Sequence, residues 1–186
     1  MTDQIDSDAT AEAEARAAER GLYNRLDGLG IAHAHHAHPP LHTVDESRAL
    51  RGDLPGAHVK NMFLKEKKGG LWLVTCLEDR AVRIRALEKA IGAKNVSFAK
   101  PEVLWEALGV RPGAVTPFAA MNDPDGAVRV VLDSAILDAP LVNAHPLHNR
   151  ATTAVAPADL VAFLEATGHA PLVLDFETLV AGEAGR

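Results

Sequence analysis

Five of the nine histidines lie within ten residues of one another, and imidazole nitrogen is a common ligand of transition metals. They are His33, His35, His36, His38 and His42. On an extended strand His33 and His35 would point to one face, and His36 and His38 to the other. Residues 31–42 contain no Asp, Glu or Cys, and the chain has no H-E-x-x-H motif. Surface or packing histidines are therefore the stronger interpretation, and the sequence predicts no metal site.

Lys60 lies in the apolar run from His58 to Leu64, where a strand would place it on the same side as Met62. If that side faces the interior, the ammonium needs a partner such as a phosphate or a polarised hydroxyl. If the strand is at an edge of the sheet, the ammonium instead reaches solvent. The sequence leaves both interpretations open.

A second polar segment, residues 143–149, places two histidines and two asparagines around Pro146. This composition suits the polar rim of a pocket, with His145 as a hydrogen-bonding group, although a histidine in a loop more often has a structural role. Motifs for a serine nucleophile (G-x-S-x-G), a P-loop and a dinucleotide site (G-x-G-x-x-G) are absent, which excludes those chemistries. Cys76 lies inside an apolar run and is interpreted as a packing residue.

The elements that must position these residues are predicted from local patterns. Leu22, Leu26 and Leu29 at helical spacing predict an opening helix, and the T-x-x-E capping box at Thr43 predicts a short helix after it. The expected helices cover residues 11–29, 44–50, 83–91, 101–108 and 157–167. The expected strands cover residues 31–38, 58–65, 71–77, 128–133, 141–144, 152–155 and 172–174, with a basic hairpin turn at 66–70 and an ordered loop over 109–117.

Irregular alternation of strands, hairpins and helices predicts an α/β fold with a mixed β-sheet and flanking helices. The 186 residues suffice for one compact domain, expected over 12–182 after a flexible acidic tail at 1–11. A single cysteine excludes an internal disulfide and a zinc finger. No apolar run reaches membrane-spanning length, and the start of the chain lacks a secretory signal. We therefore expect a soluble cytoplasmic protein with no membrane partner.

Charge is distributed unevenly along the chain, whose net charge is −6. Residues 48–100 hold twelve Lys and Arg against five Asp and Glu, whereas the rest of the chain holds seven against twenty. A basic block within an acidic protein can attract a polyanion locally. The alternative is an ordinary solvated face of a hairpin and a helix.

Four segments together resemble the YbaK/ProX family of trans-editing prolyl-tRNA deacylases, in order and in spacing. They are His38–Glu46, Leu54–Leu64, Leu104–Phe118, and Asn143–Pro146 with Ala151–Thr153. The resemblance covers about residues 20–180 and is strongest to the branch that removes alanine from proline tRNA (ProXp-ala, PrdX). It implies an α/β fold similar to the editing domain of bacterial prolyl-tRNA synthetase, and hydrolysis of the aminoacyl ester at the tRNA 3′ end.

The resemblance also implies roles for individual residues. Lys60 matches the family's functional lysine, which contacts the terminal adenosine and orients the ester, and Gly113 opens the G-x-x-x-P loop that grips the aminoacyl group. The implied substrate-binding residues are Asn61, Thr116, Pro117 and His145. Members of the family are thought to use no metal, cofactor or protein nucleophile, the ribose 2′-hydroxyl helping the attacking water.

In this reading the basic block receives the acceptor stem of the tRNA. The candidate tRNA-binding residues are Arg48, Arg51, Lys65, Lys67 and Lys68. The implied partner is mischarged proline tRNA and not DNA, and docking to prolyl-tRNA synthetase or an elongation factor is left open. Three alternatives also stay open: the same fold editing another charged tRNA such as Cys-tRNA(Pro), a non-catalytic module that binds the tRNA 3′ end, and a histidine-rich metal carrier.

Overall fold

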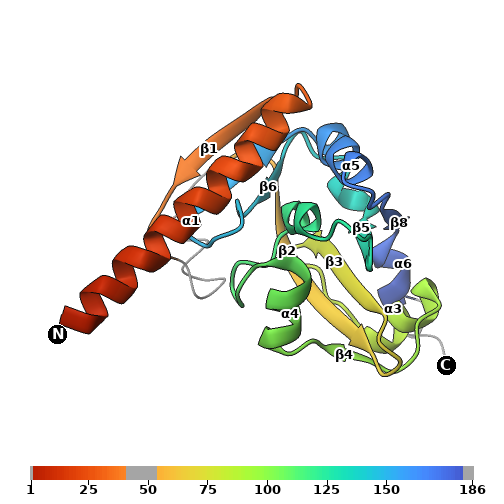
Figure 1. Cartoon of the computed structure of the whole chain (residues 1–186). Helices are drawn as coiled ribbons and strands as arrows, with labels where there is room; N and C mark the ends of the chain where they lie inside the picture. The colour runs from red at the N-terminus through yellow and green to blue at the C-terminus, as the bar shows by residue number, and fades with distance from the viewer. Residues whose placement is uncertain (1, 41–53, 182–186) are drawn as a thin grey trace.

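The computed structural model describes residues 2–40 and 54–181. Its strands are β1 (His33–Ala37), β2 (Ala57–Glu66), β3 (Leu71–Leu77), β4 (Val96–Phe98), β5 (Val128–Asp133), β6 (Val142–Ala144), β7 (Ala151–Val155) and β8 (Leu172–Leu174). Its α-helices are α1 (Thr2–Gly28), α3 (Ile84–Ile91), α4 (Pro101–Leu108), α5 (Pro157–Ala166) and α6 (Phe176–Ala181), and two short 3-10 helices are η1 (Pro117–Asn122) and η2 (Ser134–Ile136). These elements form a mixed α/β fold, as the sequence predicts (Figure 1).

The described strands form one sheet in the order β1-β7-β6-β2-β3-β5-β8, and β4 pairs with β2. β2 is antiparallel to β3 along most of its length. Its other edge pairs with β6 in parallel at only two positions, Ala57 with Val142 and His58 with Asn143. Further along, the same edge pairs with β4, from Leu64 to Glu66. Strands β2 and β6 therefore diverge after His58. The candidate site lies along the stretch of β2 between its pairings with β6 and with β4.

Both faces of the central strands of the sheet are buried, because two hydrophobic clusters enclose them. One cluster packs α1, α4, η1 and α5 against the face that carries Phe63 and Leu73. The other packs α3 and α6 against the face that carries Met62, Leu64 and Cys76. This explains why β3 is an almost uninterrupted apolar run instead of an alternating one. α1 lies along β1, at the opposite end of the sheet from β8 (Figure 1).

Most predicted elements are confirmed within a few residues, including the hairpin of β2 and β3 and the loop over 109–117. Gly109 ends α4 with φ of 62° and donates its N–H to the carbonyl of Trp105, as its position after an apolar helix predicts. The prediction for the start of the first helix is wrong, because α1 begins at Thr2 and not near Ala11. Acidic residues near a helix N-terminus favour such an extension. The division into a tail and a domain stays a prediction, and the helix expected over 44–50 lies outside the described residues.

Candidate active site

Asn61 connects β2 to the loop over 109–117. Its Nδ2 donates to the carbonyl of Val115 at 2.8 Å, and its Oδ1 accepts from the Thr75 hydroxyl at 2.8 Å. Thr75 is the register partner of Asn61 on β3 and is fully buried. Asn61 is thus held by the neighbouring strand, and in turn it fixes the position of the loop backbone.

The loop over 109–117 is held in shape mainly by backbone turns and a helix cap. Gly113 has φ of 86°, a left-handed conformation that favours glycine, and Ala114 closes a turn by donating to the carbonyl of Arg111 at 3.0 Å. The Thr116 hydroxyl accepts from the Phe118 amide at 3.4 Å and caps η1, while Pro117 is buried as the first residue of that helix. Of the three predicted site residues in this loop, Gly113 is exposed, whereas Thr116 and Pro117 are buried. At these three positions the groups that can meet a ligand are therefore backbone groups near Gly113.

Lys60 lies on the opposite face of β2 from Asn61, on the side of Met62 and Leu64 as the pleat predicts. Its ammonium donates to the carbonyl of Arg80. Arg80 is anchored in turn, since its Nε donates to the fully buried Asp133 carboxylate at 3.1 Å. An ammonium carries three N–H donors, so the bond to Arg80 uses one of them and leaves capacity for a ligand.

Cys76 is the register partner of Lys60 and is completely buried. Burial is the main cause that raises the pKa of its thiol to about 11, against a smaller opposing effect of Lys60. The thiol is therefore protonated at neutral pH, and the packing interpretation of Cys76 is confirmed.

His145 follows β6 and comes close to His38, with the two ring centroids 6.2 Å apart. Its Nδ1 donates to the carbonyl of Ala151 at 3.0 Å, because a carbonyl can only accept. Burial lowers the pKa of His145, with a further lowering by His38 and an opposing effect of the Ala151 carbonyl. A neutral imidazole with hydrogen on Nδ1 leaves its Nε2 as an acceptor.

Asn143 belongs to the polar segment 143–149, but the sequence analysis gave it no individual role. It pairs with His58, so its side chain lies on the Lys60 side of the sheet, and it is only 4 % exposed. Its Nδ2 donates to the carbonyl of Pro55 at 3.0 Å, but its Oδ1 has no hydrogen-bond partner among the described residues. A buried acceptor without a donor is costly, so a ligand donor there would be stabilising. The available signal was an asparagine in a short strand that is otherwise apolar.

The predicted site residues thus fall into two groups around the point where β2 leaves β6. Lys60 and His145 each come two residues after the pairing of His58 with Asn143, on the side of the sheet that also carries Asn143. Asn61, Gly113, Thr116 and Pro117 belong to the other side. Lys60 and Asn61 themselves lie on the stretch of β2 between its pairings with β6 and with β4.

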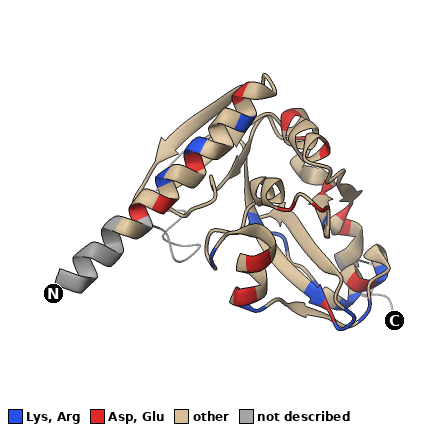
Figure 2. Ribbon diagram, viewed as in Figure 1, with Lys and Arg blue, Asp and Glu red and all other residues tan. Residues whose placement is uncertain are grey.

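The candidate tRNA-binding lysines lie at the far end of β2. Lys67 and Lys68 are exposed in the turn to β3, and Lys65 is half-buried on β2 (Figure 2). Lys67 is seven residues from Lys60, which corresponds to about 20 Å along a strand. Arg48 and Arg51 lie outside the described residues.

The predicted split of the histidines is confirmed. Tyr23 of α1 stacks on the His33 ring, with centroids 4.7 Å apart, and its hydroxyl bonds His35 Nδ1 at 2.8 Å. His38 instead bonds the Thr152 hydroxyl at 3.0 Å. Among residues 2–40 and 54–181, no three His, Cys, Asp or Glu side chains gather where they could hold a metal ion. In the same part of the chain, no helix combines the length and apolarity needed to cross a membrane.

Residues 38–163 match the family model of the aminoacyl-tRNA editing domain. The bovine prolyl-tRNA synthetase associated domain-containing protein 1 is 42 % identical over 172 residues, covering 90 % of this chain and 98 % of the relative. The prolyl-tRNA editing protein ProX of Acetoanaerobium sticklandii is 31 % identical over 153 residues, covering 82 % of this chain and 93 % of the relative.

Solved structures agree on the fold. One, provisionally described as a trans-editing enzyme for prolyl tRNA synthetase, superimposes with a TM-score of 0.66 at 24 % identity and covers 85 % of this chain and 95 % of its own. The chain therefore belongs to the aminoacyl-tRNA editing domain family.

Proposed function

We propose that this protein hydrolyses the ester bond of alanine mischarged onto proline tRNA, releasing alanine and free tRNA. The observation that carries the proposal is the hydrogen bond from Asn61 to Val115, which holds the Gly113 loop against the strand that also bears Lys60. The names of the relatives, which refer to prolyl-tRNA synthetase and to editing, support the same activity.

The need for such an activity is physical. A synthetase pocket that holds proline cannot strongly exclude the smaller alanine, because each missing methylene is worth only about 1–3 kcal/mol. A second site that admits alanine and rejects proline restores the accuracy. In our proposal the backbone around Gly113 sets that size limit, because a rigid backbone cannot move aside as a side chain can.

Hydrolysis requires water to add to the ester carbonyl, an oxyanion to be stabilised, and the ribose oxygen to leave with a proton. We assign to Lys60 the contact with the terminal nucleotide and the polarisation of the ester. His145, neutral and with an acceptor on Nε2, would accept from the ammonium of alanine, and the Oδ1 of Asn143 offers a second acceptor. Asn61, Thr116 and Pro117 keep the loop in place, so catalysis depends mainly on positioning. No step in this scheme needs a metal.

The test is hydrolysis of proline tRNA charged separately with alanine, cysteine and proline, in metal-free buffer. We expect rapid loss of alanine with proline spared, and a decrease of about 10²–10³-fold in the Lys60→Ala variant. Lys94→Ala is the matched control, because Lys94 is an exposed lysine outside the site.

Each other outcome has a defined meaning. Preferential loss of cysteine would keep the reaction and change the substrate. Absence of turnover with every ester, together with retained tRNA binding, would favour a non-catalytic module for the tRNA 3′ end. Equal rates for the wild type and Lys60→Ala would remove Lys60 from the proposed mechanism.

A further inference from the structure

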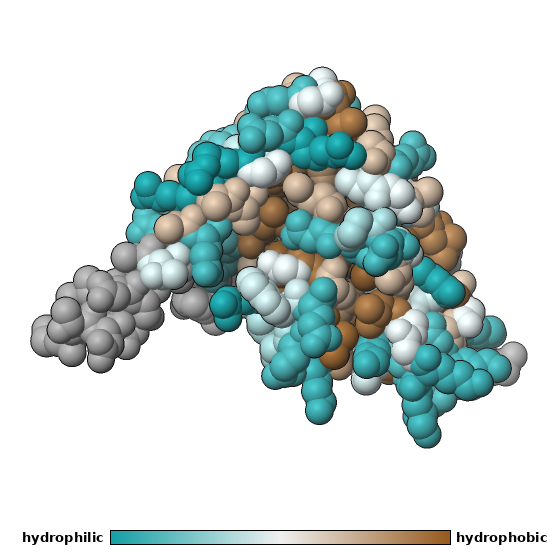
Figure 3. Space-filling view, in the orientation of Figure 1, coloured by the Kyte–Doolittle hydropathy of each residue, from teal (hydrophilic) through white to brown (hydrophobic). Residues whose placement is uncertain are grey.

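A cavity of about 280 Å³ lies on the side of α1 and is separate from Lys60. Its walls come from α1, from α4 with residues 109–114, and from residues 147–150 after β6. Figure 3 shows the surface hollowed between α1 and α4. The loop that Asn61 holds through Val115 borders this cavity through Ala114, so the cavity adjoins the proposed aminoacyl site.

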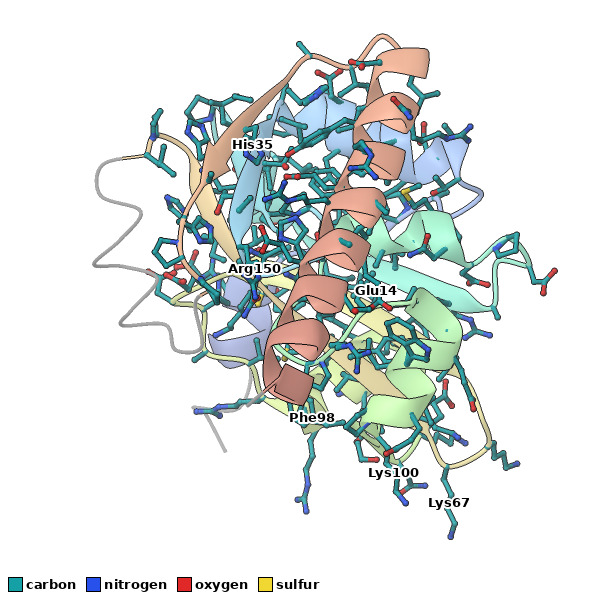
Figure 4. The ribbon with its side chains drawn as sticks, turned by 60° about the vertical axis from the view of Figure 1, so that its left-hand side comes forward. Glu14, His35, Lys67, Phe98, Lys100 and Arg150 are labelled. Atoms are coloured by element: carbon teal, nitrogen blue, oxygen red, sulfur yellow. The ribbon has the colours of Figure 1, made fainter. Side chains whose placement is uncertain are left out.

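The walls combine an aromatic ring with two guanidinium groups. Trp105 on α4 is 50 % exposed, although large aromatic side chains on helices are usually buried. The guanidinium of Arg111 lies 4.9 Å from the centre of its ring. Arg150 lines the opposite wall, and Glu14 supplies one carboxylate from the side of α1 that faces α4 (Figure 4). The apolar remainder includes Ala15, Ala18 and Leu147.

This chemistry selects a planar, hydrogen-bonding and anionic ligand. Indole and guanidinium planes stack on nucleobases, and arginine binds phosphate with paired N–H donors. A carboxylate accepts from the exocyclic amine of a base such as cytosine. The volume is at the lower limit of small-molecule pockets, about 300 Å³, so it suits a single nucleotide better than a large cofactor.

We propose that this cavity binds one unpaired nucleotide of the tRNA 3′ end, next to the terminal one. Its base stacks on Trp105, its phosphate lies against Arg111 and Arg150, and its exocyclic amine donates to Glu14. The assignment rests on the proposed function, because the terminal nucleotide must be at the Gly113 loop for its neighbour to reach this cavity. Binding here would fix the direction of the RNA strand and help deliver the aminoacyl ester to the Gly113 loop.

The test uses uncharged RNA, so that binding is measured apart from catalysis. The probe is the single-stranded RNA tetranucleotide ACCA, titrated against the full chain while tryptophan fluorescence is followed. Stacking on Trp105 should quench the emission. We expect the Trp105→Ala variant to lose that quenching and to bind about tenfold more weakly, and Trp105→Phe to restore most of the affinity. Arg111→Ala should weaken binding and reduce its dependence on salt.

Matched controls separate the cavity from general surface effects. Phe98→Ala removes an aromatic side chain that is 66 % exposed on β4, and Arg129→Ala removes a guanidinium that lies 4.9 Å from the centre of the Trp72 ring. Both variants should bind ACCA like the wild type. Equal affinity of the wild type and Trp105→Ala for ACCA, or equal weakening by the control substitutions, would overturn the nucleotide site even if the enzyme hydrolyses charged tRNA. A wild type that binds ACCA through Trp105 but hydrolyses no ester would instead overturn the proposed function.

Discussion

Gly113 is the residue at which backbone conformation and proposed function are most closely linked. Its φ of 86° is unfavourable for any residue with a Cβ, yet an added Cβ would meet nothing nearer than Asn149 Nδ2 at 3.9 Å. Gly113→Ala should therefore cost about 1–2 kcal/mol in backbone strain without a steric clash. We expect the loop to shift to relieve that strain, and deacylation to fall. Chemical denaturation and single-turnover hydrolysis would measure the two effects.

Gly126→Ala is the matched control for this prediction. Gly126 has φ of 62° and would place a Cβ 3.8 Å from the carbonyl of Gly168, so its replacement brings a similar strain at a site outside the loop. We expect a similar loss of stability with unchanged turnover. A comparable loss of turnover in both variants would show that activity follows overall stability and not the loop conformation.

At the level of elements, the attachment of α1 to the sheet depends on Tyr23. Its hydroxyl bonds His35 at 2.8 Å, Thr153 at 2.9 Å and Glu19 at 3.2 Å, and burial is the main cause that raises its pKa. Tyr23→Phe keeps the stacking on His33 but removes these bonds, and should lower the free energy of unfolding by about 1–2 kcal/mol. Faster hydrogen exchange of α1 amides would locate the loss in this helix. An unchanged unfolding free energy would mean that the Tyr23 hydroxyl adds nothing to the attachment that apolar packing of Leu22 and Leu26 and stacking of the Tyr23 ring already provide.

The elements that sequence patterns predict are those with a local signal, such as the hairpin with its glycine turn or the helices closed by Gly92 and Gly109. β4 was missed because Ser97 separates its two apolar residues and leaves no apolar run, and the strand is defined by its pairing with Leu64–Glu66 of β2. α6 was missed for a related reason, since Phe176 is buried by distant residues and not by its own helix.

The residues of the candidate site stay a prediction, and their arrangement could be predicted only in part. The motif match pointed to Lys60 and Gly113, Asn61 followed as the neighbour of Lys60, and the pleat placed Lys60 and Asn61 on opposite faces. The divergence of β2 from β6 depends on a parallel register between segments far apart in the chain, which no local pattern reveals. The buried Oδ1 of Asn143, which has no partner within residues 2–40 and 54–181, and the cavity beside Trp105 also depend on tertiary packing.

For the whole molecule, three groups make stability sensitive to acid. Burial is the main cause that lowers the pKa of His145 and of His148 below their ordinary value of 6.5. Burial alone would raise the pKa of Asp123, but hydrogen bonds from His169 and from the Val128 and Ala127 amides outweigh it and hold that pKa below 3.8. In all three cases the unfolded chain binds protons more readily than the folded one, so stability falls as pH falls.

Two pH windows follow from these directions. The free energy of unfolding should decline as pH drops below about 6.5, where the unfolded histidines become protonated, and decline again below about pH 4 as the Asp123 contribution is lost. Denaturant titrations at a series of pH values would measure both. His145→Gln should flatten the upper window and leave the lower one. A constant unfolding free energy between pH 7 and pH 5 would contradict the assignment of buried neutral histidines.

The basic turn of the β2–β3 hairpin should matter for tRNA affinity and not for the chemical step. Replacing Lys67 and Lys68 by glutamine removes two exposed charges, and the slope of log affinity against log salt should become shallower by about two. Binding of uncharged tRNA at several salt concentrations would measure the slope. Lys89→Gln, on the exposed side of α3, is the control. An unchanged slope in the double variant would place the acceptor stem on another surface.

The pairing of β1 with β7 also has a consequence for how the chain is made. His33 is paired with Val155 in the finished sheet, so β1 is synthesised long before its partner exists. During translation the backbone groups of His33–Ala37, and those of Ala57 and His58 that face β6, stay unpaired until residues 142–155 emerge. Such distant closure slows folding and exposes strand edges to other nascent chains. A ribosome that stalls before β7 would therefore hold a polypeptide prone to aggregation, and a chaperone acting on this protein would have to protect its first half.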